Sequence, residues 1–381
     1  MLTVQDRPRA QGGMTRRLLR ATLSLAACLS PMAACHAQAT NADTAPRGPF
    51  NIVVKNDKLT LAVAKATQVY ISGTIDANAP KRFEDMLRTG KIPSDSDIYL
   101  DASGDDVTAG YALGKLFRDS AMTTHLGALK LPGEPPRSAT CSNACLFAFM
   151  GGLYRWSPSG ADRLGVRQSF VGGLWPRGPQ KTQTPADMVD YLKRMDINFW
   201  SLVRSPVPQP NDMVWLDADQ TNGWGVANNG RLPLHADYPT EAIPPTLTLS
   251  QVTRAGMNRM TVVCTPTGAT LTAYYTVGAE RAKQLVARQQ RALFEINQLE
   301  ILPMQSGRAR VTGDAIVISR PLSFEQLNAF LNTFSTGAWI KDKNGAVRYG
   351  FTMGPARVKD SYTTYFANCQ KSAPRAASPA Q

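Results

Sequence analysis

The chain has 381 residues, of which 43% are hydrophobic and 19% are charged. This composition is typical of globular proteins and excludes a largely disordered chain, and the length fits one large domain or two ordinary ones. The formal net charge is +13, yet the sequence has no run of five basic residues and no stripe of interleaved aromatic and basic residues, so we expect no nucleic-acid partner.

Residues 1–39 have the pattern of an export signal that follows a short N-terminal extension. Met14 precedes the basic segment TRRLLR, a short apolar segment and the small residues AQA, which end at Ala39. The apolar segment is too short to span a bilayer, so we expect no transmembrane helix in the processed chain. The sequence therefore predicts export to the periplasm. The alternative is a lipoprotein anchored through Cys28 or Cys35.

Four cysteines follow this segment, and an even number in an oxidising compartment predicts disulfide bonds. We expect a long-range bridge between Cys264 and Cys369. Cys141 and Cys145 form either a local bridge or two buried thiols. Their C-x-x-x-C spacing is not that of a zinc or redox site, so we expect no metal and no cofactor.

The first half of the chain, after a polar linker at 40–50, alternates strands and helices and is assigned to one domain, 51–234. This pattern predicts βαβ units and a mostly parallel sheet. The expected strands lie at 51–72, 98–100, 123–126 and 164–167, and the expected helices at 80–88, 107–120 and 141–152. Ligands of such sheets bind where strands end and helices begin, which is where the segments ASGDD and CSNAC lie. Asp106 and Ser142 are the expected N-caps of the helices that follow.

The second half has a different pattern. A proline-rich linker at 235–247 precedes residues 248–370, which predict a smaller α+β domain built from antiparallel hairpins. Residues 279–299 predict a long amphipathic helix, and Ser323 with Gln326 predicts a capping box. Asn344-Gly345 is a typical hairpin turn. The polar tail, 371–381, is expected to be disordered.

Three segments of the first half carry a resemblance to a known family. They are Asp101–Gly110, Cys141–Gly152 and Leu164–Arg167. In order and spacing they resemble the Clp protease proteolytic subunit and crotonase superfamily, and in particular the exported Clp-like proteins of bacterial envelopes. The resemblance covers about residues 65–228. It implies a fold of repeated ββα units, a Ser-His-Asp catalytic triad with an oxyanion hole, and assembly into homo-oligomers.

The chain departs from this family at its catalytic positions. The nucleophile position falls on Ser142 or Asn143, and the histidine position is Arg167, which stays protonated and cannot act as a base. In the oxyanion turn Gly104 is followed by Asp105, where the family has a second glycine. The acidic position, near Asp212, is kept.

These departures predict an exported Clp-like protein that is not catalytic and acts by binding or scaffolding. Its ligand would be a peptide, a protein or a small acyl or anionic molecule. Arg167 is expected to form an ion pair with Asp105 or Asp212. The alternative is a divergent serine hydrolase that uses Ser142 as its nucleophile, with His125 and His235 as the remaining histidines that could supply a base.

Overall fold

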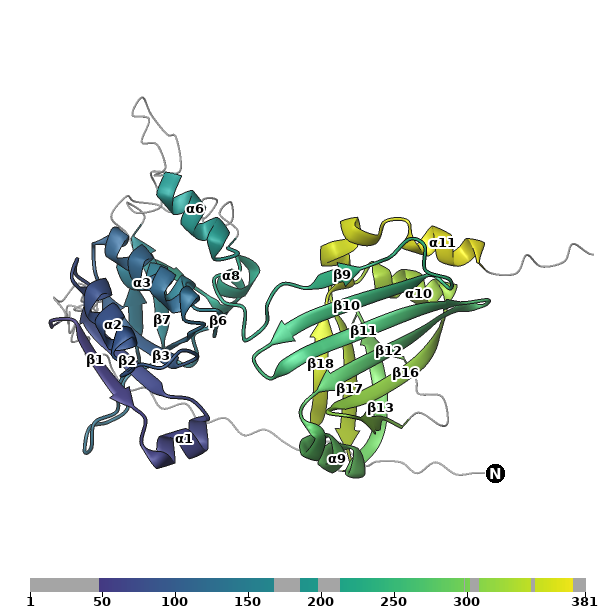
Figure 1. Ribbon diagram of the computed structural model, residues 1–381, viewed down its shortest axis with the longest axis horizontal. Helices are drawn as coiled ribbons and strands as arrows, with labels where there is room; N and C mark the ends of the chain where they lie inside the picture. Colours follow the sequence, from purple (N-terminus) through teal and green to yellow (C-terminus); the bar gives the residue numbers. More distant parts are fainter. Residues whose placement is uncertain are drawn as a thin grey trace, which may run out of the picture. The chain divides into compact units, whose positions relative to one another are not determined.

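The computed structural model describes residues 48–167, 186–197, 213–297, 299–301, 308–343 and 347–372 (Figure 1). The protein has a mixed α/β fold. Its buried side chains form two separate hydrophobic clusters, one within residues 50–226 and the other within residues 247–369. Among the described residues, no helix is both long and apolar enough to cross a membrane.

A five-stranded sheet is the centre of the first cluster. Its order is β1-β2-β3-β4-β6, with β1 antiparallel to β2 and the other neighbours parallel. The strands are β1 (Asn51–Lys55), β2 (Gln68–Thr74), β3 (Asp97–Ser103), β4 (Thr123–Leu126) and β6 (Tyr154–Arg155). The predicted, mostly parallel sheet is thereby confirmed.

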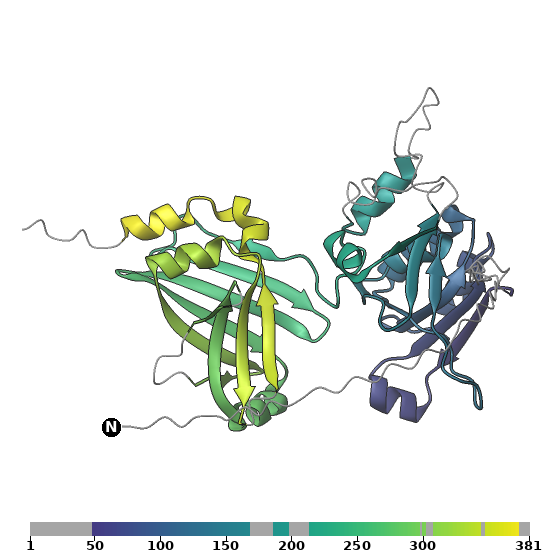
Figure 2. The ribbon, with the colours of Figure 1, turned by 180° about the vertical axis from the view of Figure 1, so that it is seen from behind.

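Two of the helices pack on one face of this sheet, and a smaller sheet completes the cluster. Figures 1 and 2 show α2 and α3 on the same face. The helices are α1 (Lys58–Ala64), α2 (Ala79–Arg88), α3 (Val107–Asp119), α4 (Ala144–Met150), α6 (Ala186–Arg194) and α8 (Ala218–Gly223). The three-stranded sheet, in the order β5-β7-β8, consists of β5 (Thr140–Ser142), β7 (Arg163–Arg167) and β8 (Met213–Leu216).

Antiparallel strands surround the second cluster, as the hairpin patterns predict. A six-stranded sheet has the order β15-β16-β12-β11-β10-β9, and a four-stranded sheet has the order β14-β13-β17-β18. The strands are β9 (His235–Asp237), β10 (Thr246–Thr253), β11 (Gly256–Thr265), β12 (Gly268–Thr276), β13 (Gln289–Ile296), β14 (Leu299–Ile301), β15 (Arg310–Thr312), β16 (Ala315–Ser323), β17 (Thr336–Asp342) and β18 (Arg348–Met353). The helices are α9 (Ala279–Ala287), α10 (Phe324–Leu331), η3 (Pro355–Tyr362) and α11 (Tyr365–Lys371). The capping box of Ser323 and Gln326 is present at the start of α10.

Both cysteine pairs form disulfide bonds. Cys264 of β11 is bonded to Cys369 of α11, and Cys141 is bonded to Cys145. The long-range bridge fixes the last helix on the six-stranded sheet. There, the Tyr365 hydroxyl also donates a hydrogen bond to the Val262 carbonyl at 2.8 Å.

Three predicted elements differ from the structure. The predicted strands at 51–72 are interrupted by α1, which begins after the N-cap Asp57. The apolar and polar residues of α1 alternate, which is why the segment was assigned to a strand. The predicted helix at 279–299 ends at Ala287. After it, β13 pairs with β14 and β17, and this tertiary pairing outweighs local helix propensity. The predicted linker at 235–247 contains β9, which pairs with β10.

The export signal, Cys28, Cys35, Asp212, Asn344-Gly345 and residues 373–381 lie outside the described residues. The signal, the lipoprotein alternative and the disordered tail therefore stay predictions.

The long-range disulfide should contribute more stability than the local one, because it closes a much longer loop in the unfolded chain. The cysteines are 105 residues apart in one bridge and 4 in the other. Chain-entropy arguments predict a loss of about 4–5 kcal/mol for Cys264→Ser/Cys369→Ser and about 2 kcal/mol for Cys141→Ser/Cys145→Ser. Urea unfolding of the two variants measures this, and a larger loss in the local pair would contradict it.

Candidate functional site

Asn143 forms a sharp turn between β5 and α4. Its φ of 55° and ψ of −115° are unusual for a residue other than glycine, and such values cost on the order of 1–3 kcal/mol. Strain of this kind at a strand-to-helix turn characterises the nucleophile elbow of hydrolases, where the strained residue is the nucleophile. Of the two positions that the sequence leaves open, Asn143 and not Ser142 occupies the turn.

Ser142 is the last residue of β5, and its 4% exposed fraction makes it a buried residue. The expectation that Ser142 caps the helix is wrong, because the N-cap position belongs to Asn143, whose side chain makes no capping bond. The segment 141–152 was expected to be helical from its start, yet β5 runs to Ser142 and α4 begins at Ala144. The Cys141–Cys145 disulfide therefore spans a strand end and a first helical turn, and encloses the elbow between them.

The side chain of Asn143 joins three segments of the fold. Its Oδ1 accepts a hydrogen bond from the backbone N–H of Arg167 at 2.8 Å, and its Nδ2 donates to Oδ1 of Asp105 at 3.2 Å. The same Asp105 oxygen lies 3.3 Å from an Arg167 guanidinium nitrogen, which gives one of the two ion pairs expected for Arg167. We call Asp105, Asn143 and Arg167 the Asn143 cluster.

The backbone amides at the elbow are already hydrogen bonded. The N–H of Ala144, the residue after the elbow, donates to the Gly104 carbonyl at 2.9 Å. The N–H of Asn143 donates to the Gly165 carbonyl at 3.1 Å. In hydrolases with an elbow, the N–H that follows the nucleophile is an oxyanion donor and must be available to the substrate. Here the Ala144 N–H is already bonded to the Gly104 carbonyl, so it is not available to a substrate.

Glycines allow this close approach of the backbones. A Cβ atom on Gly104 would lie 2.4 Å from the Ile75 carbonyl oxygen, and one on Gly110 of α3 would lie 2.4 Å from that of Ala144. A side chain at Gly104 would push the β3–α3 turn away from Ile75, and one at Gly110 would push α3 away from the start of α4. Gly110 therefore sets the distance between α3 and α4, and Gly104 lets the turn that bonds Ala144 pass close to Ile75.

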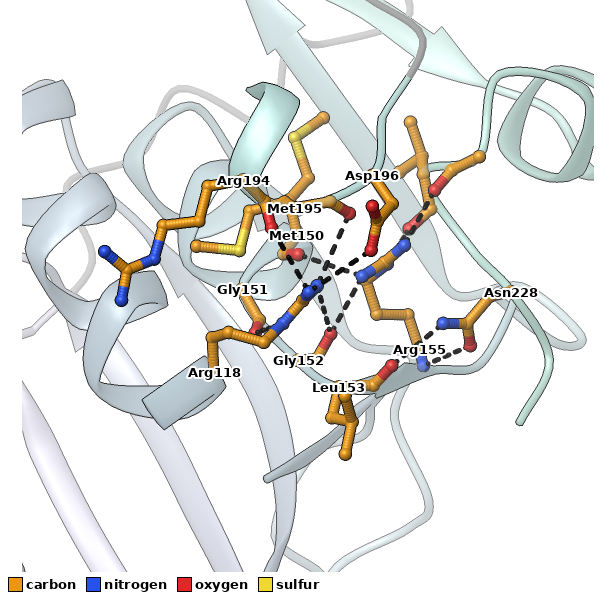
Figure 3. Close-up of polar contacts among 12 residues, drawn as sticks. Arg118, Met150, Gly151, Gly152, Leu153, Arg155, Arg194, Met195, Asp196 and Asn228 are labelled. Carbon is orange, nitrogen blue, oxygen red and sulfur yellow. Dashed lines mark hydrogen bonds and ion pairs between the residues drawn. The ribbon is translucent and has the colours of Figure 1, made fainter. Parts of the chain in front are cut away.

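The opposite end of α4 is held by two arginines, Arg118 of α3 and Arg155 of β6 (Figure 3). The Arg118 guanidinium donates to the carbonyls of Gly151 and Gly152, each at 3.2 Å. Arg155 donates to the carbonyls of Met150 at 3.3 Å and Gly152 at 2.9 Å, so both arginines share the Gly152 oxygen. The carbonyls of Met150 and of the two glycines that follow α4 thereby accept hydrogen bonds that the helix itself cannot supply.

The same two arginines bind the segments that follow in the chain. Arg118 also donates to the carbonyls of Arg194 and Met195, each at 3.3 Å, and its guanidinium lies 3.5 Å from a carboxylate oxygen of Asp196. Arg155 donates to the carbonyls of Val226 at 2.9 Å and Gly225 at 3.1 Å. The arginines therefore join α4 to the ends of α6 and α8.

Arg155 is 2% exposed, and within the described part of the chain it forms no ion pair. Burial, and then the neighbouring charge of Arg118, lowers the pKa of its guanidinium to about 9. It therefore remains protonated at neutral pH, with its charge stabilised mainly by carbonyl dipoles. Sequence analysis did not identify this residue. The available signal was a single arginine in the otherwise uncharged segment GGLYRWSP.

The remaining histidines do not reach the elbow. His125 lies in β4, where its ring stacks between those of Tyr99 and Trp156 with centroids 4.8 and 6.2 Å away. His235 lies in β9, which belongs to the six-stranded sheet. Among the described residues, no histidine or lysine side chain is hydrogen bonded to Ser142. The same residues contain no group of three His, Cys, Asp or Glu side chains placed to hold a metal ion.

Among solved structures, a mutant ClpP1 from Listeria monocytogenes aligns with 45% of this chain and with 94% of its own length. The sequence identity is 13% and the TM-score is 0.30, so the likeness is to a ClpP-like fold at most. No protein-family model matches the sequence, and no curated protein matches it either.

Replacing Arg155 should destabilise the first cluster strongly, because Arg155→Met leaves the carbonyls of Met150, Gly225 and Val226 without this donor, while Gly152 keeps Arg118. We expect a loss of about 3–5 kcal/mol in the free energy of unfolding, because each buried acceptor left without a donor costs about 1–3 kcal/mol. The matched control is Arg194→Met. Its guanidinium forms an exposed ion pair with Asp119 at 2.6 Å, which contributes about 0–1 kcal/mol. Equal losses in the two variants, measured by urea unfolding, would refute the assigned role of Arg155.

Proposed function

We propose that the chain is an exported, Clp-like protein that has lost hydrolytic activity and acts in the cell envelope by binding or scaffolding. The observation that carries this proposal is Asn143 at the elbow. An amide is not a nucleophile of the kind that serine, threonine or cysteine supplies. Both ends of this amide are also held by hydrogen bonds to the backbone of Arg167 and the carboxylate of Asp105.

Two further features of the site support the loss of activity. Arg167 occupies the position where a base is expected, and a guanidinium cannot accept a proton at physiological pH. The oxyanion donor at Ala144 is bonded to Gly104, so a substrate carbonyl would have to displace a hydrogen bond that is already formed. The elbow residue is therefore not a nucleophile, the residue at 167 cannot accept a proton, and the oxyanion donor is already hydrogen bonded.

Export is supported by two independent features. After a short N-terminal extension, residues 14–39 contain a basic segment, an apolar segment and a small-residue cleavage pattern. The structure holds two disulfide bonds, which persist in oxidising compartments such as the periplasm. The ligand would be a peptide, a protein or a small acyl or anionic molecule, and homo-oligomers are expected from the resemblance alone.

A fluorophosphonate probe tests the proposal directly, because it labels activated serine nucleophiles. We expect no labelling of the intact chain. The matched control is Ser142→Ala, since Ser142 is the serine nearest the elbow in sequence. Labelling of the intact chain that disappears in Ser142→Ala would establish the alternative, a divergent serine hydrolase, and overturn the proposal.

The single substitution Arg167→His should also restore no peptide hydrolysis. It supplies a base but leaves an amide at the elbow and an occupied oxyanion donor. Turnover of a fluorogenic peptide is the measurement, with the intact chain as the reference. Peptidase activity in Arg167→His that is abolished by adding Ser142→Ala would show that only the base was missing. It would contradict the proposal that Asn143, and not a serine, stands at the nucleophile position.

A further inference from the structure

Helix α1 carries three exposed apolar side chains. The exposed fractions of Leu59, Leu61 and Val63 are 73%, 42% and 76%, and no residue of the helix is buried. Figures 1 and 2 both show α1 at the end of the β1–β2 hairpin, away from α2 and α3. Leu59 and Val63 are four residues apart and share one face of the helix, whereas Leu61, two residues from each, lies on the other side. The face of Leu59 and Val63 is a candidate interaction surface.

The helix is well defined although it has no core contact. Asp57 accepts hydrogen bonds from the backbone N–H of Leu59 at 3.1 Å and of Thr60 at 3.0 Å. At the other end, Lys65 adopts a left-handed conformation and its N–H donates to the Leu61 carbonyl at 3.1 Å. Seven residues are too few for a stable isolated helix, so these caps and the hairpin hold α1 in place. The apolar side chains are therefore presented by a formed element.

Lysines flank this apolar surface. Lys58 opens the helix, Lys65 ends it, and Lys55 lies at the end of β1 with its ammonium group 5.4 Å from the centre of the Tyr70 ring. In the part of the chain that the structure describes, none of the three lysines forms an ion pair. The nearby carboxylate of Asp57 is engaged by the helix N-terminus. The surface therefore combines apolar side chains with three lysines that have no carboxylate partner among the described residues. Asp57 stays ionised beside them, and its one negative charge offsets part of their positive charge.

We propose that α1 docks the protein on a lipid bilayer that contains anionic phospholipids. Leu59 and Val63 enter the boundary between headgroups and acyl chains, and Lys55, Lys58 and Lys65 contact lipid phosphates. Apolar side chains flanked by lysines favour the interface of an anionic bilayer. The charge pattern favours a bilayer over a second copy of the chain, because three lysines on each copy would repel one another. A seven-residue helix also presents far less than the roughly 800 Å² per partner of a stable protein interface.

Vesicle co-sedimentation of the full chain tests this proposal. With vesicles of phosphatidylglycerol and phosphatidylcholine, we expect Leu59→Ser/Val63→Ser to weaken binding at least tenfold. Leu61→Ser, on the other side of the helix, should change binding little. We expect Lys55→Gln/Lys58→Gln/Lys65→Gln to weaken it by about fivefold for each lysine. The lysine variant should leave binding to pure phosphatidylcholine unchanged, and added salt should weaken the intact chain more than this variant.

The matched control is Val252→Ser/Met257→Ser/Leu299→Ser, which removes three exposed apolar side chains from other elements. It should bind like the intact chain. All variants keep the apolar segment near the N-terminus, so differences between them report on α1 alone.

A second readout does not depend on removing apolar residues. Val63→Trp should bring a new tryptophan into the bilayer, where brominated lipids quench it. Quenching that exceeds that of the intact chain is the expected result.

Equal binding of the intact chain and the α1 serine variant, together with no added quenching in Val63→Trp, would overturn the proposal. So would concentration-dependent self-association that the serine substitutions abolish without any effect on vesicle binding, since the surface would then join copies of the chain. Neither outcome bears on the fluorophosphonate test.

Discussion

Helix α4 is seven residues long, and every one of its side chains is buried. The carbonyls at the end of such a helix have no partner within the helix and no access to water, so the fold must supply donors. It does so with the hydroxyls of Thr124 and Tyr191, which donate to the carbonyls of Phe149 and Phe147, and with two guanidinium groups beyond them. These donors come from four elements of the first cluster: β4, α6, α3 and β6.

The two ends of α4 meet this requirement in different ways. At the carboxyl end, charged donors from β6 and α3 are buried at some energetic cost and hold the helix rigidly. At the amino end, a strained residue makes the turn and neutral backbone groups complete the hydrogen bonds. An active hydrolase would need free donors and a reactive side chain at that amino end. In this protein the corresponding groups are hydrogen bonded to the rest of the fold: the Ala144 N–H to Gly104, and the Asn143 amide to Asp105 and Arg167.

The sequence predicts the parts of this arrangement that depend on local pattern. Asp106 caps α3 as expected, since an N-cap is recognisable from a few residues. The disulfide partners Cys264 and Cys369 could be paired because few cysteines remain after the first 39 residues. The position of Asn143 could not be decided, because strand β5 is defined by its pairing with β7 and not by its own three residues. Residues 289–296 were misassigned for the same reason: their pairing with a distant strand determines their conformation.

The contact between Asn143 and position 167 runs through the backbone N–H of Arg167, a group that every residue except proline possesses. A different side chain at 167 would therefore keep this bond, and would lose only the exposed ion pair with Asp105. A different side chain at 143 would lose both hydrogen bonds of the amide. Position 143 is therefore the more constrained of the two.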